Sequence, residues 1–349
     1  MKTGKSLTEL AMELERQSSA KTDYIANTSA LEMTPTGKLA IESDSHQEFP
    51  ITPHAHAQIA ARLDIPAKYY NRMKAEVPEL LAANVNKWFH SKPSRRMVRT
   101  LDGSMRAFLS DRYRRLDNFD LASAALPILA SMGEGIEIVS SELTGSRMYI
   151  KAINRRLELS VKKGDVVQAG VCITNSEVGL GSLKVEPLVF RLICTNGLIA
   201  QDYATKKYHV GRVADEGEAY ELYSDETLKA DDRAFYLKVQ DTVRAAVDVA
   251  KFGQIVNRMQ AATEQKIEGN PVAAVSVLSE KFGYDNEEKS GILTHLIQGG
   301  DLTAYGLLNA ITRTSQDLTD YDRSTELERD ARKVLNLPAA TCQAIATAK

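Results

Sequence analysis

Residues 166–199, VVQAGVCITNSEVGLGSLKVEPLVFRLICTNGLI, hold two apolar runs, and each run leads into a short polar loop. Val, Ile, Phe and Cys are frequent in both runs, which is the composition of buried β-strands. The loops are TNSE at 174–177 and TNG at 195–197. We expect this stretch to form the core of a sheet around which the rest of the chain folds.

Strand-like runs continue on both sides of this stretch, from residue 136 to residue 213. Turn-forming pairs such as Thr144-Gly145 and Lys163-Gly164 separate them, and no connection is long enough to hold a helix. Antiparallel neighbours need only a tight turn, so the spacing predicts a mainly antiparallel sheet. The expected strands are IEIVSSEL, SRMYIKAI, RLELSV, DVVQAGVCIT, SLKVEPLVFRLIC and YHVGRV (208–213).

Helical patterns precede this sheet. An amphipathic helix is expected within residues 1–20, and residues 21–50 form an irregular arm with one short strand near 38–41. Residues 51–89 predict helices that break at Pro66 and Pro78. The run QIAARLDIPAKYYNRM within them has the cadence of a helix-turn-helix, although a plain helical hairpin is the commoner structure with this pattern.

A β-hairpin and a further helix lead into the sheet. Asp102-Gly103 supplies a hairpin turn within residues 94–110, and a helix is expected from Phe119 to Met132. Beyond an acidic loop at 214–232 the chain is helical again, with one long helix expected over residues 235–263. The other helices expected there are PVAAVSVLSEKFG, EEKSGILTHLIQGG, TAYGLLNAITRTSQ and ELERDARKVLN.

These patterns predict an α+β fold in which a central, mainly antiparallel sheet is flanked by N-terminal and C-terminal helical portions. We divide the chain into three segments. They are an N-terminal helix and irregular arm (1–50), helical hairpins leading into the central sheet core (51–213), and an acidic loop with the C-terminal helical portion (214–349).

The composition is that of an ordinary soluble protein, with 43% hydrophobic and 26% charged residues. No apolar run approaches the roughly 20 residues that span a bilayer, and the N-terminus lacks the apolar core of a signal peptide. The three cysteines fit no disulfide framework, which favours reduced thiols in a reducing compartment. We therefore expect a cytoplasmic protein with no membrane partner.

Basic residues concentrate between positions 92 and 115, where eight Lys and Arg face only Asp102 and Asp111. Arginine binds phosphate with two parallel hydrogen bonds, and aromatic rings stack on bases. We expect Arg99 and Arg106 to project from the hairpin towards nucleic acid, most naturally single-stranded DNA. The alternative is a solvated strand face that pairs with the acidic stretch at 215–232. The predicted nucleic-acid-binding residues are Trp88, Arg95, Arg96, Arg99, Arg106, Arg112, Tyr113, Arg114 and Arg115.

The polar loops of the central stretch give a second candidate site. Asn and Ser side chains beside Gly179 and Gly181 can form an oxygen-lined pocket or an anion-binding nest, which the second loop would face. A buried Arg191 would need Glu177 or Glu186 as its partner. The alternative is ordinary turn chemistry, in which Asn, Ser and Gly only close the loops. The candidate pocket residues are Asn175, Ser176, Glu177, Lys184, Arg191 and Asn196.

Other chemistry finds little support in the sequence. Among six histidines only His54 and His56 are close, no HExxH occurs, and DLTDYDRSTE lacks the glycine of a calcium loop, so no metal is expected. There is no GxxxxGK[ST], no suitably placed GxGxxG and no GxSxG, so we expect no cofactor and no ATP-driven motor. We assign no catalytic residues.

Several long segments resemble one family. AFLSDRYRRLDNFDL, GVCITNSEVGLGSLKVEPLVFRLICTNGLI and LTAYGLLNAITRTSQDLTDYDRSTELE occur here in the order of the phage- and plasmid-like DUF932 family. With the helical stretch around LDIPAKYYNRM, the resemblance extends from about residue 50 to about residue 335. It implies a mobile-element setting and supplies no catalytic residues.

The charge cluster and this setting together lead to a functional hypothesis. We expect a nucleic-acid-binding protein of a phage or other mobile element, which handles single strands in replication or recombination without ATP hydrolysis. Binding-driven strand handling favours a multimeric surface, so a homo-oligomer is expected. The alternatives are a protein-interaction factor acting on a host system, and a nucleotide or nucleic-acid enzyme that uses the 175–197 loops.

Overall fold

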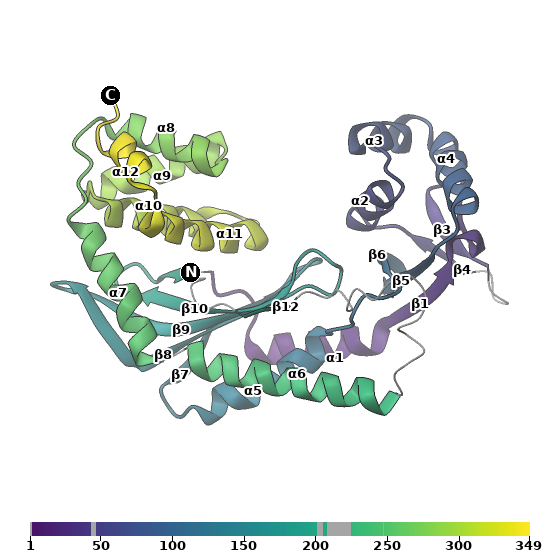
Figure 1. The fold of residues 1–349 in the computed structure, drawn as a ribbon, viewed down its shortest axis with the longest axis horizontal. Coiled ribbons are helices and arrows are strands. Elements are labelled where there is room, and N and C mark those ends of the chain that lie inside the picture. Colours follow the sequence, from purple (N-terminus) through teal and green to yellow (C-terminus); the bar gives the residue numbers. More distant parts are fainter. Residues whose placement is uncertain (1, 43–46, 201–204, 208–224, 247) are drawn as a thin grey trace.

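The computed structural model describes residues 2–42, 47–200, 205–207, 225–246 and 248–349. The described chain forms two lobes, a smaller one from residues 21–110 and a larger one around the central sheet (Figure 1). The predicted α+β class is confirmed.

The smaller lobe combines two three-stranded antiparallel sheets with three helices. The sheet orders are β1-β5-β6 and β2-β3-β4, and Leu39, Ile59, Val85 and Phe108 belong to one shared core. The elements are β1 (Lys21–Asn27), η1 (Thr28–Ala30), β2 (Leu31–Met33), β3 (Lys38–Ile41), β4 (Gln47–Pro50), α2 (Pro53–Arg62), α3 (Ala67–Glu76), α4 (Pro78–Ser91), β5 (Arg95–Leu101) and β6 (Ser104–Ser110).

Several local predictions hold in this lobe. The hairpin turn lies at Asp102 and Gly103, whose positive φ angles of 49° and 70° match the tight turn expected of this pair. The helices break at Pro66 and Pro78, and the short strand near 38–41 is β3. The arm at 21–50 is more regular than expected, because β1 pairs along its whole length with β5.

The larger lobe is built on a sheet with the order β11-β10-β9-β8-β7, and β12 also pairs with β10. Every pairing is antiparallel, as predicted. The predicted strand YHVGRV lies outside the described residues. The strands are β7 (Ile136–Leu143), β8 (Met148–Lys162), β9 (Asp165–Asn175), β10 (Leu183–Arg191), β11 (Asn196–Ile199) and β12 (Thr205–Lys207).

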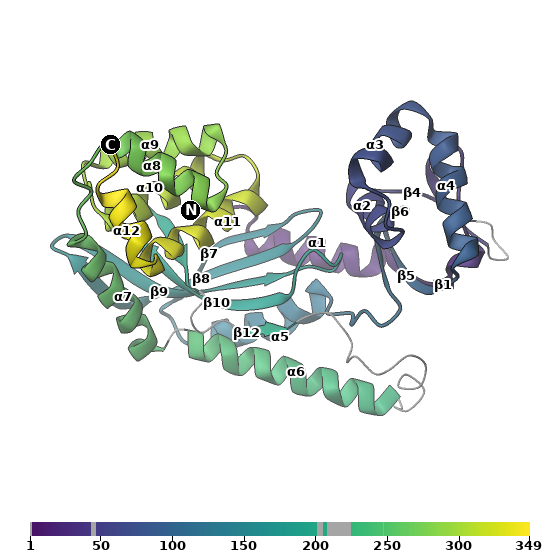
Figure 2. The same cartoon turned by 45° about the horizontal axis from the view of Figure 1, so that its top comes forward.

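Alternation along the strands gives this sheet two different faces. Ile150, Val171 and Val185 point to one face, where they pack with α1 (Leu7–Ala20), α5 (Asn118–Ser131) and α6 (Asp225–Ala246). These helices lie along one side of the sheet in both ribbon views (Figures 1 and 2).

The opposite face carries polar groups. Lys151, Cys172 and Glu186 lie side by side across β8, β9 and β10, and α11 packs over them. The C-terminal helices share a core with one end of the sheet. They are α7 (Val249–Thr263), α8 (Pro271–Phe282), α9 (Asn286–Gly299), α10 (Ala304–Asp317), α11 (Tyr321–Ala331), η2 (Arg332–Asn336) and α12 (Ala339–Ala346).

Two C-terminal expectations need correction. The long helix predicted over 235–263 is two helices, because the Asp248 side chain caps a new helix by accepting a hydrogen bond from the backbone N–H of Lys251. The acidic loop predicted at 214–232 lies outside the described residues up to 224, and α6 has already begun at Asp225.

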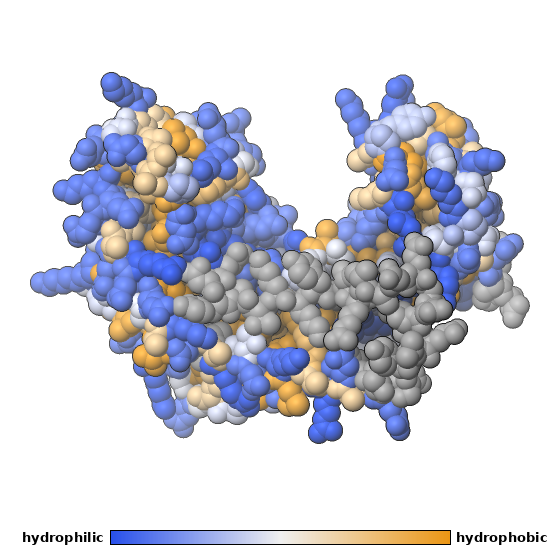
Figure 3. Space-filling view, in the orientation of Figure 1, coloured by the Kyte–Doolittle hydropathy of each residue, from blue (hydrophilic) through white to orange (hydrophobic). Residues whose placement is uncertain are grey.

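The small lobe and the C-terminal helices of the larger lobe lie apart from each other on the same side of the molecule (Figure 1). The space-filling view shows the surface hollowed between the small lobe and the C-terminal helices (Figure 3). Helices α2 and α3 lie on the small-lobe side of this hollow, and α11 extends towards it from the other side (Figures 1 and 2). The site described next lies beside α11.

Candidate functional site

The arginines predicted to bind nucleic acid have several different environments. Arg99 is fully buried where the two lobes meet. Its Nε donates to Asp23 Oδ1 at 2.8 Å, its Nη2 to Asp117 Oδ1 at 2.7 Å, and its Nη1 to the carbonyl of Glu177 at 3.0 Å. The expectation that Arg99 projects into solvent is therefore wrong, because three acceptors from three parts of the chain enclose its guanidinium.

Arg106 is also buried, and it serves the same junction. Its Nη2 donates to Glu177 Oε2 at 2.6 Å, while Glu177 Oε1 accepts the backbone N–H of Asn118 at 2.5 Å. Asn118 is the first residue of α5, so Glu177 satisfies a free N–H at a helix N-terminus, where a negative charge is favourable. Asn175 supports the same place by donating to the carbonyl of Leu116 at 2.7 Å.

The other members of the cluster differ in exposure and in partners. Arg96 is buried, and burial together with the nearby Arg62 charge lowers the pKa of its guanidinium. Trp88 is 42% exposed on α4, and Arg95 is exposed at the start of β5. The remaining four are partly buried or paired: Arg112 is half-buried, Tyr113 donates to the carbonyl of Ser176, Arg114 pairs with Asp231, and Arg115 pairs with Asp23.

The Arg114 ion pair agrees with one part of the alternative prediction, in which the arginines pair with the acidic stretch at 215–232. Its Nη1 lies 2.8 Å from Asp231 Oδ2, within the acidic stretch at 215–232. Most of that stretch lies outside the described residues.

The structure separates the second predicted site into two parts. Asn175 ends β9, whereas Arg191 pairs with Val167 near the beginning of that strand, eight residues away, or about 26 Å along an extended chain. Arg191 binds Asp165 through two hydrogen bonds of 2.6 and 2.7 Å, so the expected partners Glu177 and Glu186 are wrong. Near the same end, the side-chain amide of Asn196 donates to Thr312. Arg191 and Asn196 therefore do not face Asn175.

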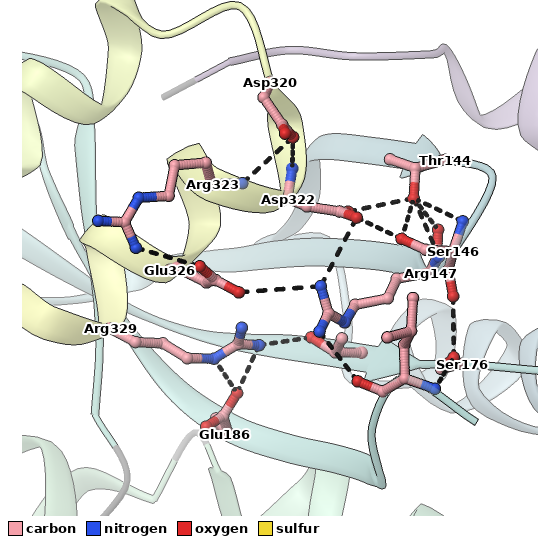
Figure 4. A network of polar contacts seen from close by, with 12 residues as sticks. Thr144, Ser146, Arg147, Ser176, Glu186, Asp320, Asp322, Arg323, Glu326 and Arg329 are labelled. Atoms are coloured by element: carbon pink, nitrogen blue, oxygen red, sulfur yellow. Dashed lines mark hydrogen bonds and ion pairs between the residues drawn. The ribbon is translucent and has the colours of Figure 1, made fainter. Parts of the chain in front are cut away.

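Asn175, Ser176 and Lys184 instead line a pocket of about 230 Å³ between the sheet and α11. Its walls are the end of β9, the 176–182 loop, the start of β10 and one side of α11 (Figure 4). The basic side chains that converge on it are Arg147, Lys184, Arg323, Arg329 and Lys333. The same 176–182 loop contacts the small lobe, so the pocket lies at the floor of the hollow between the lobes.

Arg329 forms the inner wall of this pocket. Its Nε donates to Glu186 Oε2 at 2.8 Å, and its Nη2 donates to Thr174 Oγ1 at 2.7 Å. Burial would lower the pKa of Arg329, but the Glu186 carboxylate together with Cys172 and Tyr149 outweighs burial and raises it. The guanidinium is therefore a permanent and rigidly placed charge.

Arg323 and Arg147 stand on either side of Glu326 (Figure 4). Arg323 binds Glu288 with two hydrogen bonds of 2.5 and 2.8 Å, and its Nη1 donates to Glu326 at 3.2 Å. Arg147 donates to the Leu180 carbonyl at 2.9 Å through Nη2. Its Nη1 lies 3.6 Å from Asp322 and 3.9 Å from Glu326, which is attraction without a hydrogen bond.

Polar contacts also attach α11 to the sheet beneath the pocket. Lys151 and Glu328 form an ion pair at 2.6 Å in which both side chains are only 1% exposed. Burial would lower the pKa of Lys151, but Glu328 together with Tyr321 and Cys172 outweighs burial and raises it. At the start of the helix, Tyr321 and Ser140 share a hydrogen bond, and Asp322 accepts hydrogen bonds from Thr144 and Ser146. These contacts fix the helix that forms one wall of the pocket.

The charges around the pocket nearly balance. Five basic residues and two acidic ones, Glu326 and Asp330, line it, while Glu186, Asp322 and Glu288 sit behind the arginines. The pocket therefore offers directed donors and acceptors rather than a large net charge. Among the described residues no His, Cys, Asp and Glu side chains gather in a group that could hold a metal ion.

Sequence reasoning missed the α11 part of this pocket. Charged residues at 323, 326, 330 and 333 follow helical spacing, which predicts a solvent-exposed face. Nothing in that pattern shows that a sheet lies against the helix. The detectable signal was the polar 174–177 loop, which identified three of the lining residues.

Comparisons with known proteins agree with the resemblance seen in the sequence. No curated protein and no solved structure matches the chain. No helix in the described ranges is long and apolar enough to cross a bilayer. One family model matches residues 107–335, a stretch that contains every residue lining the pocket. The chain therefore belongs to the DUF932 family, a domain of unknown function.

Proposed function

We propose that this protein binds single-stranded nucleic acid in the hollow between its two lobes. The observation that carries the proposal is the convergence of five basic side chains on one pocket at the floor of that hollow. The role we assign is strand handling in the replication or recombination of a phage or other mobile element. The mobile-element setting comes from the family resemblance.

The chemistry of the pocket suits phosphate. Guanidinium groups donate to phosphate oxygens in a planar fork, and Lys adds a mobile point charge. Arg323 and Arg329 are held by carboxylates behind them, so little side-chain entropy is lost when a strand binds. Arg147 keeps one amino group beyond hydrogen-bond distance of its acidic neighbours, ready to meet a ligand.

The small lobe offers groups of the same kind across the hollow. Helix α3 exposes Lys68, Tyr69, Asn71 and Arg72, a set that can contact phosphates and stack on bases. Helix α2 joins this wall to the floor, because His54 and Gln58 both contact the Val178 carbonyl. A strand in the hollow would therefore meet positively charged groups from both lobes.

Fluorescence anisotropy tests this proposal with a labelled single-stranded oligonucleotide and a duplex of the same sequence, at low and high salt. The double variant Arg147→Gln, Lys184→Gln removes two cations from the pocket. We expect its Kd for the single strand to rise at least about tenfold, since a hydrogen bond to a charged group is worth about 1.5–3 kcal/mol. The salt slope should fall by about 1.4, or about 0.7 per lost contact.

A matched control is available on the sheet itself. Arg155 and Arg156 are more than 60% exposed on β8, about 26 Å along the strand from Arg147. Arg155→Gln, Arg156→Gln removes the same charge and should leave the Kd close to that of the native protein. An equal loss of affinity in both double variants would show non-specific electrostatic attraction, and the pocket would then not be the binding site. An absence of binding at low salt would reject the function.

A further inference from the structure

We infer that the pocket beneath α11 is a site for a phosphate monoester attached to a sugar, that is, a terminal nucleotide. The group can come from the phosphorylated end of a strand or from a free nucleotide. The strand as its source rests on the proposed function. The inference follows from the free donors, the nearby acceptors and the size of the pocket.

Two guanidinium groups retain donors for a ligand. In the described part of the chain, Arg329 donates only through Nε and Nη2, so its Nη1 group keeps both of its N–H donors. Among the residues that the structure describes, Arg147 donates only through Nη2, to the Leu180 carbonyl. Both side chains line the pocket, so their remaining amino groups can be shared by one phosphate.

The charge balance favours a terminal phosphate over an internal one. A pocket whose cations are matched by acids gains little from long-range attraction, so binding depends on directed hydrogen bonds. A monoester carries nearly two negative charges at neutral pH and presents three acceptor oxygens. An internal phosphodiester has one charge and two free oxygens, so it satisfies fewer of the donors of Arg147 and Arg329.

The acceptors in the pocket suit the sugar. Glu326 and Asp330 line the same cavity as the arginines, and carboxylates accept hydrogen bonds from sugar hydroxyls. Ser182 adds a hydroxyl that can donate or accept. Glu326 already accepts from Arg323 and Asp330 pairs with Lys333, but each carboxylate has further lone pairs that can accept from a sugar hydroxyl. A plain inorganic anion would engage only the donors of the pocket, whereas a nucleotide can engage donors and acceptors.

The size of the pocket limits the ligand to one unit. Its volume of about 230 Å³ equals that of roughly eight water molecules. This accommodates a phosphate and its sugar, with the base or the next nucleotide outside. The sheet closes the inner side of the pocket, where Thr174 is buried and binds Arg329. A strand therefore cannot pass through the pocket on that side.

Anisotropy with four labelled oligonucleotides of one sequence tests the inference. They carry a 5′-phosphate, a 3′-phosphate, no terminal phosphate, or no ends because the strand is circular. We expect at least one phosphorylated form to bind about tenfold more tightly than the unphosphorylated and circular forms. Arg147→Gln should abolish this difference, whereas Arg155→Gln should leave it intact. Arg147→Lys keeps the positive charge but lacks the paired donors of a guanidinium. We expect it to give an intermediate difference in Kd between the phosphorylated and unphosphorylated strands.

Calorimetry with free dTMP separates the two sources of the ligand. If dTMP binds to the native protein but not to Arg147→Gln, and no oligonucleotide binds, the pocket assignment holds and the nucleic-acid function fails. If all four oligonucleotides bind equally and dTMP does not bind, the nucleic-acid function holds and this inference is rejected. If neither dTMP nor any oligonucleotide binds, both are rejected.

Discussion

At the scale of single residues, an arginine's chemistry does not reveal where it points. Arg95 and Arg99 lie on the same strand, yet Arg95 is exposed and Arg99 is fully buried. The difference comes from Asp23 and Asp117, which belong to β1 and to the start of α5 and are distant in sequence. A cluster of like charges in a sequence can therefore form either an exposed binding surface or a buried contact between two lobes.

Replacing Arg99 should affect stability first. Arg99→Ala leaves the carboxylates of Asp23 and Asp117 without their main partner in a dry junction, and loss of one member of a buried ion pair costs about 3–5 kcal/mol. Arg95→Ala should change the free energy of unfolding by no more than about 0.5 kcal/mol, because its side chain is exposed. Urea unfolding measures both values. Native stability in Arg99→Ala together with weakened DNA binding would instead return Arg99 to the binding surface.

The candidate site was only partly predictable, because the position of a side chain depends on contacts with residues distant in sequence. The sequence identifies Asn175, Ser176 and Lys184, because polar residues that interrupt buried strands are conspicuous. It places Asn196 opposite them incorrectly, since loops that follow one another in the sequence lie at opposite ends of antiparallel strands. The partners of Glu177 could not be predicted, because they depend on how the hairpin and α5 meet.

At the scale of elements, turns and helix breaks were predictable because their signals are local. The hairpin at 95–110 follows from Asp102-Gly103, and the breaks between the helices of the small lobe lie at Pro66 and Pro78. Strand β1 was missed because KTDYIAN has no continuous apolar run, and its pairing with β5 is a tertiary contact. A helix was predicted over residues 326–336, whereas α11 begins earlier, at Tyr321, and ends at Ala331, and its attachment to the sheet was not predicted.

That attachment gives a prediction about α11. Lys151→Met should lower the free energy of unfolding by about 3–5 kcal/mol, because Glu328 is left as a buried, unpaired charge. Adding Glu328→Leu should restore most of that loss, since an apolar pair of similar volume avoids the cost of burying two charges. Urea unfolding of the single and double variants measures the recovery. A double variant no more stable than Lys151→Met would mean that the ion pair itself stabilises the interface.

At the scale of the whole molecule, apolar contacts hold each lobe, and ion pairs join the lobes together with a small apolar cluster around Val178. The small lobe has its own core, and the central sheet contributes to separate cores at its two ends. The junction between them depends on Arg99, Arg106 and Lys21 with their acidic partners. The same 176–182 loop borders the junction and the proposed ligand pocket, so the placement of the lobes also shapes the floor of the hollow.

Acid should therefore weaken the junction through Asp117. Burial would raise the pKa of this carboxyl, but the charges of Arg99 and Lys21 outweigh burial and hold it below its ordinary value. A carboxyl with a depressed pKa stabilises the fold fully above the unfolded pKa of about 3.9, and this contribution is lost as the pH falls through the lower, folded pKa. Native protein and Asp117→Asn should thus differ most in free energy of unfolding near pH 7 and progressively less below about pH 4.

Urea unfolding of both proteins between pH 7 and pH 3 measures this gap. Glu76→Gln is the matched control, since Glu76 pairs with Arg72 on an exposed helix face, where an ion pair contributes less than about 1 kcal/mol. Its difference from the native protein should stay small at every pH. A gap for Asp117→Asn that is constant from pH 7 to pH 3 would show that the variant acts through packing. The junction would then owe its strength to shape rather than to the charges that the sequence concentrates between residues 92 and 115.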